Sequence, residues 1–449
     1  MIKIGFLPLY IELYDRCCPD DAVKAREYAA ALKQKLESCG FEVAAAPVCR
    51  LKFEFAKAVQ FFEEEQCEAI VTVHLAYSPS LEAVEALAHT DLPIVIMDTT
   101  PTAHFTSPLT EVMPNHGIHG VQDLGNQLLR NGKKFLITAG ALDDTLLKNV
   151  SRLVKSAAMA YKMSHLRIGR AGGEFVGMGD FVFEPGTIGI KEVCWNGMPE
   201  PSEEEVEAEM AANRAMFVEK NLPEDVLRRT ARVDLQVRRW VDENKLDGIT
   251  VCFCGICRQD GWETVPFLEG SLGMARKIGY AGEGDVLTAG LHAALFKAFD
   301  KCGFSEMFCP DWIGGRIYVS HMGEINPDIV QGKAMLTEMN YKFSDTGRPA
   351  VAFGSFMPGK AVWVDLVPMA EGKFRLIAAP IEFEETPAEI RNMPRNSGFF
   401  RPASKSVGDF LAEYTRLGGT HHSVVVYNGD MDILKNFAEL MNWDFQTIL

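Results

Sequence analysis

The chain has 449 residues, of which 47% are hydrophobic and 24% are charged. This length exceeds what one hydrophobic core usually supports, and the composition is that of a soluble globular enzyme with two or three domains. The formal net charge of −16 argues against a nucleic-acid partner, which needs a basic face, and against binding to an anionic membrane surface.

The N-terminus and the cysteines indicate where such a chain works. The first residues, MIKIGFLPLYIELYD, form a short apolar run that contains one lysine and is broken by Pro8, a pattern typical of a first β-strand and not of a signal peptide. No apolar run approaches the roughly 20 residues that span a bilayer. The eleven cysteines are an odd number and lie mostly within predicted strands and helices, which suits reduced thiols. We therefore expect a cytoplasmic protein.

The first third of the sequence alternates strands and helices. Its strands are almost continuous apolar runs, which is typical of a parallel sheet covered on both faces. We expect this α/β domain to end at residue 165. The predicted strands are 2–9, 41–46, 69–74, 93–97 and 134–139, and the predicted helices are 20–39, 53–66, 81–88, 121–130 and 144–163.

The stretch 166–300 has the pattern of a second α/β domain. Two long, charged helices begin after Ser202 and at Pro223, both of which favour helix starts. A third helix has Asp285 as its N-cap and Gly303 as the glycine that ends it. The predicted elements are helices over 203–219, 223–243 and 286–300 and a buried strand over 246–254.

From about residue 301 the pattern changes to strands with alternating polarity and short turn signals such as Pro358-Gly359. Strands are predicted over 350–353, 360–367 and 373–378, and a final helix over 431–441. We therefore predict an α/β protein in which two Rossmann- or flavodoxin-like parallel-sheet domains, 1–165 and 166–300, precede an antiparallel, β-rich and barrel-like C-terminal domain, 301–449.

Candidate metal ligands gather around the helix predicted over 286–300. Glu283 stands just before it, while Glu306 and His321 follow it. The helix is roughly 21 Å long, and six extended residues cover about 20 Å, so Glu306 can return to the level of Glu283. Each residue alone has an ordinary explanation, since an acid before a helix is stabilised by the helix dipole. A histidine pair, His421-His422, lies in GGTHHSVVVYNGD.

Two glutamates and two histidines are a plausible ligand set for a divalent first-row metal such as Mn²⁺. Other signals are weaker. The CFCGIC segment lacks a second cysteine pair, and the glycine-rich GRAGGEFVGMG segment lacks the strand–GxGxxG–helix order of a phosphate loop. The segment NHGIHG, 115–120, follows a strand of the first sheet, at the edge where ligands usually bind, although a capping turn explains it equally well.

Taken together, these motifs resemble the L-arabinose isomerase family. The segment AGEGDVLTAGLHAAL resembles the family's AEGD segment, FSEMF occupies the place of its next glutamate motif, SHMGE resembles SHML, and GGTHHSVVVY resembles GGAHHTV. Upstream, HLAYSP is similar to the family's HTFSP. The likeness spans most of the chain in the same order, and the wider group includes L-fucose isomerase.

The resemblance assigns roles to individual residues. It implies that Glu283, Glu306, His321 and His422 are metal ligands and that Glu283 and Glu306 are also the catalytic pair. A nearby carboxylate, Asp311, competes with Glu306 for its role. Three further residues are implied to contact the substrate, with the first reaching it from a neighbouring subunit: His119, His116 and Met178.

The implied reaction is a metal-dependent aldose–ketose isomerisation of a pentose or hexose through a cis-enediol, with Mn²⁺ as the expected cofactor. The sugar stays open, because two glutamines of the family fall at Leu7 and His116 here. A metal-dependent sugar epimerase and a non-catalytic sugar-binding relative remain alternatives. The family also implies a homo-oligomer, expected to be a hexamer, and a small-molecule sugar as the only ligand besides the metal.

Overall fold

The computed structural model describes residues 1–106, 108–184 and 186–449, which divide into two compact units. The smaller unit comprises Met1–Lys162 and Asp432–Asn442. The larger unit comprises Met163–Met431 and Trp443–Leu449. Its central sheet and its β-rich part correspond to the second and third predicted domains, and the three-domain division itself stays a prediction.

The smaller unit contains a five-stranded parallel sheet in the order β2-β1-β3-β4-β5, which is the strand order of flavodoxin-like folds. Residues of β1 alternate between the two faces, since Phe6 belongs to one core cluster and Leu7 to the other. The strands are β1 (Lys3–Leu9), β2 (Glu42–Ala45), β3 (Ala69–His74), β4 (Ile94–Asp98) and β5 (Phe135–Ala139).

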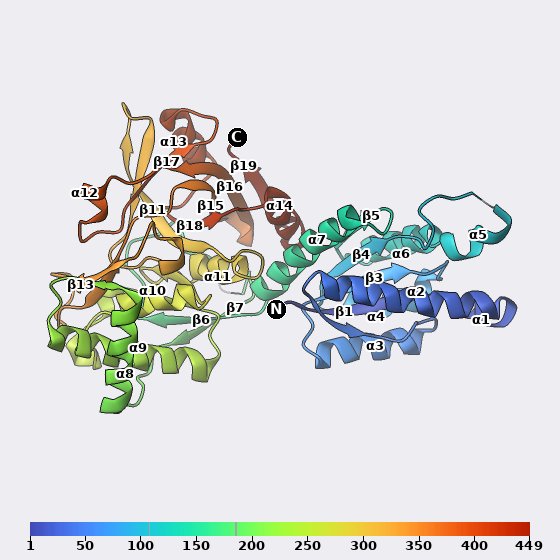
Figure 1. The fold of residues 1–449 in the computed structure, drawn as a ribbon, viewed down its shortest axis with the longest axis horizontal. Helices are drawn as coiled ribbons and strands as arrows, with labels where there is room; N and C mark the ends of the chain where they lie inside the picture. The colour runs from blue at the N-terminus through green and yellow to red at the C-terminus, as the bar shows by residue number, and fades with distance from the viewer. Residues whose placement is uncertain (107, 185) are drawn as a thin grey trace. The chain divides into compact units, whose positions relative to one another are not determined.

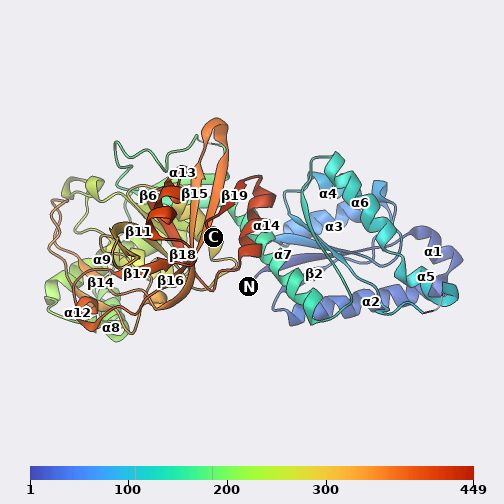
Figure 2. The same ribbon diagram turned by 90° about the horizontal axis from the view of Figure 1, so that it is seen from above.

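Helices cover both faces of this sheet (Figure 2). On one face lie α2 (Pro19–Ser38) and α7 (Asp144–Met163). On the other lie α3 (Lys52–Glu64), α4 (Ser80–His89) and α6 (Ile118–Arg130). The short helices α1 (Glu12–Cys17) and α5 (Pro108–Asn115) were not predicted, because so few residues give no sustained apolar period.

The last helix, α14 (Met431–Met441), has the predicted bounds and belongs almost wholly to the smaller unit. The Ser156 hydroxyl of α7 donates a hydrogen bond of 3.0 Å to the backbone oxygen of Ile433. Lys134 Nζ donates another, of 2.7 Å, to the backbone oxygen of Glu439. These long-range bonds explain why a C-terminal segment packs with the N-terminal sheet.

The larger unit begins with a four-stranded parallel sheet in the order β10-β9-β6-β7. Sequence patterns did not predict β6 and β7, because LRIGRA and IKEVC mix charges into short runs. The strands are β6 (Leu166–Ala171), β7 (Ile190–Cys194), β9 (Gly248–Val251) and β10 (Gly279–Gly282), and the helices are α8 (Glu203–Met216), α9 (Glu224–Asn244), α10 (Phe267–Ala275) and α11 (Val286–Leu295).

The C-terminal strands form a closed antiparallel barrel (Figure 1). Its order is β15-β18-β11-β12-β17-β16, and pairing of β15 with β16 closes the ring, while β19 adds to β16 in parallel. The predicted fold class is therefore confirmed. The strands are β11 (Cys302–Asp311), β12 (Arg316–Ser320), β15 (Gly359–Pro368), β16 (Phe374–Phe383), β17 (Gly398–Pro402), β18 (His422–Tyr427) and β19 (Asp444–Thr447).

Smaller elements complete the larger unit. The strands β8 (Val218–Glu219), β13 (Met335–Glu338) and β14 (Ala350–Phe353) form a separate three-stranded sheet. Helices α12 (Ala388–Arg391) and α13 (Val407–Arg416) flank β17 in the sequence. Among the described residues, no helix combines the length and hydropathy that crossing a membrane requires.

Some predicted boundaries are wrong. The helix predicted over 203–219 ends at Met216, and Val218–Glu219 form β8. Helix α11 ends at Leu295, and Gly303 does not terminate it but lies in β11, opposite Val425 of β18. The apolar period misled the prediction because Phe296 and Phe299 stay buried after the helix has ended. These two residues are still buried, but the regular helix ends at Leu295.

The aromatic core of the barrel permits a test of its contribution to stability. Phe400 is fully buried, and its ring centroid lies 5.4 Å from that of Trp363 and 5.9 Å from that of Phe410. Replacing Phe400 by alanine leaves a cavity, so we expect the free energy of unfolding to fall by about 3–5 kcal/mol. Urea-induced unfolding measures this change. The matched control is Ile313→Ala, at a fully exposed side chain, which we expect to change the free energy by less than about 0.5 kcal/mol.

Candidate metal centre

Glu283 stands where β10 gives way to α11, in an unusual backbone conformation. Its φ angle is +64°, which is rare for a residue with a side chain, and Gly284 follows with φ +85°. The turn is held by hydrogen bonds from the backbone N–H of Glu283 to the backbone oxygen of Val251, 2.8 Å, and from the Phe175 N–H to the Glu283 oxygen, 3.1 Å. Glycine is needed at 284, because a Cβ there would lie 2.6 Å from the oxygen of Gly173.

The other candidate ligands come from three adjacent barrel strands. Glu306 of β11 is paired with Ser320 of β12 on one side and with His422 of β18 on the other. His321 directly follows Ser320. The strand register therefore brings Glu306, His321 and His422 together, although 116 positions separate the first from the last.

In both buried histidines, a carboxylate is hydrogen-bonded to the ring nitrogen Nδ1. His422 Nδ1 lies 2.9 Å from Asp285 Oδ2, and His321 Nδ1 lies 2.7 Å from Glu324 Oε2. Asp285 also caps α11, since its Oδ1 accepts a hydrogen bond of 2.9 Å from the Thr288 N–H. Carboxylates in this position fix the tautomer and the ring orientation, so the opposite nitrogen, Nε2, is left free to bind a metal.

The free nitrogens face the glutamates. His422 Nε2 lies 3.1 Å from Glu306 Oε1 and 3.3 Å from Glu283 Oε2, and His321 Nε2 lies 3.3 Å from Glu306 Oε1. Both nitrogens are buried, yet neither has a partner in a well-directed hydrogen bond. Ligands that lie about 2.0–2.2 Å from one ion are separated from each other by roughly 3–4 Å. These side chains therefore fit a divalent cation that accepts carboxylate and imidazole ligands.

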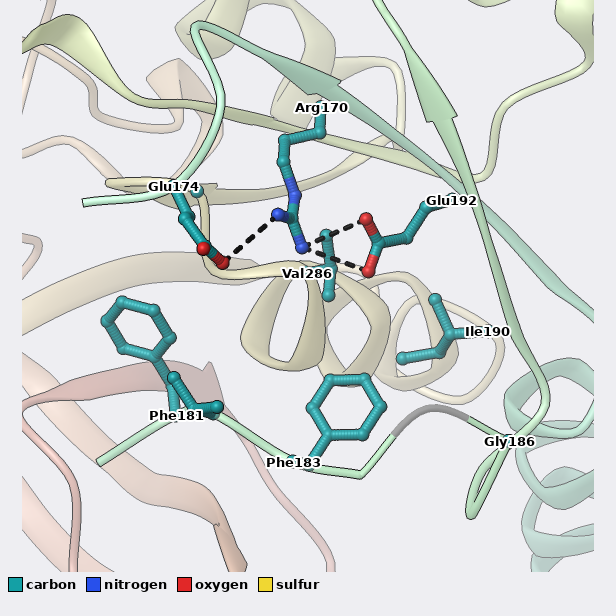
Figure 3. A pocket seen from close by; sticks show the side chains of 10 residues that line it. Arg170, Glu174, Phe181, Phe183, Gly186, Ile190, Glu192 and Val286 are labelled. Atoms are coloured by element: carbon teal, nitrogen blue, oxygen red, sulfur yellow. Dashed lines mark hydrogen bonds and ion pairs between the residues drawn. The ribbon is translucent and has the colours of Figure 1, made fainter. Parts of the chain in front are cut away.

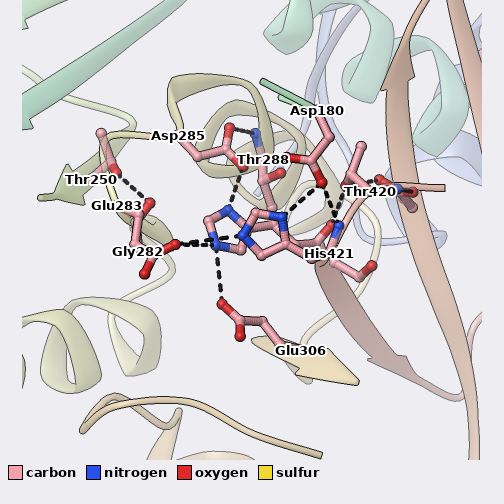
Figure 4. Close-up of polar contacts among 12 residues, drawn as sticks. Asp180, Thr250, Gly282, Glu283, Asp285, Thr288, Glu306, Thr420 and His421 are labelled. Atoms are coloured by element: carbon pink, nitrogen blue, oxygen red, sulfur yellow. Dashed lines mark hydrogen bonds and ion pairs between the residues drawn. The ribbon is translucent and has the colours of Figure 1, made fainter. Parts of the chain in front are cut away.

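His421 also reaches this cluster (Figure 4). Its Nε2 lies 3.5 Å from Glu283 Oε2, while its Nδ1 and its backbone N–H lie 2.7 Å and 2.9 Å from Asp180 Oδ2. One ligand atom from each of Glu283, Glu306, His421 and His422 lies within 4.8 Å of all the others. The set that the geometry selects thus includes His421, and His321 adjoins it through Glu306.

The charged groups of the cluster shift one another's pKa values. Burial raises the pKa of Glu283, but His421 and His422 beside it lower that pKa to about 2. Burial raises the pKa of Glu306 as well, and His321 and His422 hold it well below the usual range. Burial lowers the pKa of His321, whereas Glu324 and Glu306 raise it to about 10. Both glutamates are therefore ionised at neutral pH and can bind a cation.

Aromatic side chains pack against the histidines of the cluster. Phe304 meets the rings of His321 and His422 edge-on, at centroid distances of 4.8 Å and 5.0 Å. Phe181 stacks on His422 at 5.1 Å with an interplanar angle of 3°. The low-dielectric walls strengthen the electrostatic interactions between the charged groups.

A cavity of about 550 Å³ adjoins the cluster, and it shares Phe181 and Gly284 with the walls of the site. Figure 3 shows Arg170 in this cavity between two carboxylates. Its guanidinium lies 3.4 Å from Glu174 and 2.9 Å from Glu192. The arginine is thus neutralised within the wall, and among the described residues that line the cavity no other cation is present for a phosphate group.

The other predicted site residues are His116, His119, Met178 and Asp311. His116 and His119 belong to the smaller unit, at the start of α6, where His116 Nε2 lies 3.1 Å from the Tyr14 hydroxyl. Met178 is half-buried in the glycine-rich segment of the larger unit. Asp311, the predicted competitor of Glu306, lies in the β11–β12 hairpin, where it accepts hydrogen bonds from the Gly314 N–H, 2.8 Å, and from Arg316 Nε, 3.0 Å.

Sequence reasoning missed the supporting carboxylates. Asp285 was recognised only as a helix cap, Glu324 only as the last letter of SHMGE, and Asp180 not at all. The spacing of His321 and Glu324 was a usable signal, because a carboxylate three residues after a histidine can reach its ring in a turn. No local signal marks Asp180, whose partner His421 lies 241 positions away.

The fold and the cluster together define a class: two parallel α/β sheets joined to a closed antiparallel barrel, with a Glu/His cluster between the second sheet and the barrel. Comparison with known proteins shows which family this chain is similar to. Residues 301–444 match the L-arabinose isomerase C-terminal domain. The chain is thus similar to the L-arabinose isomerases, and the resemblance seen in the sequence motifs is confirmed.

Similarity to individual relatives extends beyond this domain. The L-arabinose isomerase of Mannheimia succiniciproducens is 23% identical over 412 residues, which cover 85% of this chain and 81% of that protein. The enzyme of Shouchella clausii is 23% identical over 406 residues, covering 84% and 81%. That of Bacillus subtilis is 22% identical over 402 residues, covering 84% and 80%.

The tight packing at Gly282 generates a prediction. A Cβ at this position would lie 2.7 Å from His321 Cε1 and 2.9 Å from His321 Nε2, so Gly282→Ala must displace the ring. We expect the free energy of unfolding to fall by about 1–3 kcal/mol, and a crystal structure to show His321 moved away from Glu306. Gly179→Ala is the control, since nothing lies within 4 Å of a Cβ there. An unmoved His321 would contradict this reading of the site.

Proposed function

We propose that this protein is a metal-dependent aldose–ketose isomerase that acts on a pentose or hexose. The observation that carries the proposal is the convergence of Glu283 and Glu306 with buried imidazoles, in a chain similar to L-arabinose isomerases over most of its length. An aldose–ketose isomerase is an intramolecular oxidoreductase. It requires a group that removes a proton from one carbon and a group that returns it to the next.

In this proposal Glu283, Glu306, His321 and His422 hold a divalent metal, most suitably Mn²⁺. When bound, the cation polarises the carbonyl and the neighbouring hydroxyl of the sugar and makes the C–H bond between them more acidic. Asp285 and Glu324 keep the two imidazoles in the tautomer that presents Nε2. Phe304 and Phe181 cover the imidazole rings, which limits the access of water.

The proton transfer is carried by the two glutamates. One carboxylate takes the proton from C2 of the aldose and becomes a carboxylic acid, which leaves a cis-enediolate. The hydroxyl proton moves from O2 to O1, and the glutamate pair returns the proton that it took to C1, so that the ketose is formed and both carboxylates are ionised again. Neighbouring histidines hold the pKa values of Glu283 and Glu306 below the usual range, so both carboxylates are ionised at neutral pH. Proton transfer of this kind typically contributes about 10²–10⁴-fold to the rate.

We further propose that His116, His119 and Met178 contact the sugar and that the active protein is a homo-oligomer, with a hexamer as the expected form. His119 is exposed on the first turn of α6, where a group from outside this chain can reach it. A site shared between subunits would bring His119 of one copy to the substrate of another.

The glutamate pair provides the central test. Glu283→Gln and Glu306→Gln each remove a carboxylate while preserving shape, so we expect ketose formation to fall by at least about 10²-fold with the fold retained. The assay incubates Mn²⁺-loaded protein with a panel of pentoses and hexoses and detects ketose. Circular dichroism checks the fold.

Asp311→Asn is the matched control, because this carboxylate lies on the same strand as Glu306, β11, but is bound to Arg316 and the Gly314 N–H. We expect it to keep full activity. Activity retained in both glutamine variants would overturn the assignment. Interconversion of two aldoses without ketose would identify an epimerase, and sugar binding without turnover would identify a non-catalytic relative.

Removal of the metal gives an independent check. Dialysis against a chelator should abolish ketose formation, and addition of Mn²⁺ should restore it, because in this proposal the bound cation polarises the carbonyl. Full activity in protein shown by elemental analysis to be metal-free would contradict the metal dependence.

A further inference from the structure

We infer that His421 is a metal-binding side chain of this centre and that Asp180, on a glycine-rich segment, positions it. This inference rests on the proposed metal-dependent function and extends it to two residues outside the motif-derived ligand set. The segment in question, residues 172–184, is called the glycine-rich segment below.

The first support is the position of the His421 ring. The side chain of His422 is fully buried, whereas that of His421 is 37% exposed. His421 therefore lies at the open side of the cluster, beside Glu283. Its Nε2 is 3.5 Å from Glu283 Oε2, too long for a strong hydrogen bond but within the separation of two ligands on one ion.

The second support is the way the ring is held. Asp180 accepts hydrogen bonds from both Nδ1 and the backbone N–H of His421, so the carboxylate fixes the ring and the chain that carries it. This repeats the arrangement of Asp285 with His422 and of Glu324 with His321. In all three cases a carboxylate occupies Nδ1 and Nε2 faces the cluster, which is the arrangement of metal-binding histidines.

The third support is how two consecutive residues reach one site. Side chains alternate along a strand, so neighbours in β18 would point to opposite faces. His421 precedes the strand, which begins at His422. Its ring is therefore not bound to the strand alternation and can lie on the same side as that of His422. The two ring centroids are 4.1 Å apart.

The glycine-rich segment places Asp180 there. It is attached to the site by the hydrogen bond from the Phe175 N–H to the Glu283 oxygen and by the stacking of Phe181 on His422. Between these attachments the chain has little packing, and Val176 is 90% exposed. Left-handed backbone at Gly172, Gly173 and Gly177 lets the segment turn back toward the barrel. Its glycines thus shape a support for His421, not a phosphate loop.

The test measures Mn²⁺ binding directly, by electron paramagnetic resonance titration of free Mn²⁺ with the full-length protein. We expect His421→Ala and Asp180→Ala each to weaken binding by about 10–100-fold. The double variant should lose no more than His421→Ala alone, because Asp180 acts through His421. Val176→Ala, on the same segment, is the matched control and should bind as the unaltered protein does.

A spectroscopic signature separates ligation from a structural role. Electron spin echo modulation of the bound Mn²⁺ reports the imidazole nitrogens attached to it, and His421→Ala should lose one such coupling. If His421→Ala retains both the affinity and the full set of nitrogen couplings, the inference is overturned. Failure of the proposed function is a different result, namely protein that binds Mn²⁺ through these residues but forms no ketose from any aldose.

Discussion

The site depends on hydrogen bonds between buried carboxylates and the Nδ1 atoms of the imidazole rings. Asp285 is the central case, since one oxygen caps helix α11 and the other holds His422 of the barrel. A single side chain thereby links the start of an α/β helix to a strand of a different sheet. Removing one partner of such a buried pair leaves an uncompensated charge, which typically costs several kcal/mol. The same interaction therefore positions the site and joins the layers around it.

Strand register is the second constraint. Glu306 lies opposite both Ser320 and His422, and a slip of one residue would turn its carboxylate to the other face of the barrel wall. Closure of the barrel makes such a slip costly, because each strand is paired on both sides and the apolar side chains of β18 are fully buried. The precision of the site on the barrel side thus follows from the architecture and not from local contacts alone.

The α/β side works differently, because it stores strain. Glu283 adopts a left-handed conformation at the carboxyl end of β10, and Gly284 and Gly282 on either side are packed against Gly173 and His321. Such conformations persist only where surrounding contacts over-determine them, and they concentrate at functional sites. The carboxyl ends of parallel strands are also where ligands bind in α/β sheets. Here the adjoining barrel supplies the opposite wall, so the two kinds of sheet share one site.

Much of this protein is determined by the sequence alone. Elements with a continuous apolar run or a clear helical period, such as β3 and α14, were predicted with their bounds, since these patterns are local properties. The types and order of the motif residues, Glu283, Glu306, His321 and His422, were enough to indicate the family. The short strands β6 and β7 and the end of α11 were not predictable, because short or mixed patterns carry no clear period.

The tertiary structure alone decided how the side chains meet. The orientation of the histidines by Asp285, Glu324 and Asp180, and the entry of His421 into the cluster, are fixed by barrel closure and by contacts between segments up to 241 positions apart. Periodicity records which residues are buried along a helix or strand, but it contains no information on which distant partner each buried group will meet. That pairing is set by strand register and by the requirement that buried charges be hydrogen-bonded.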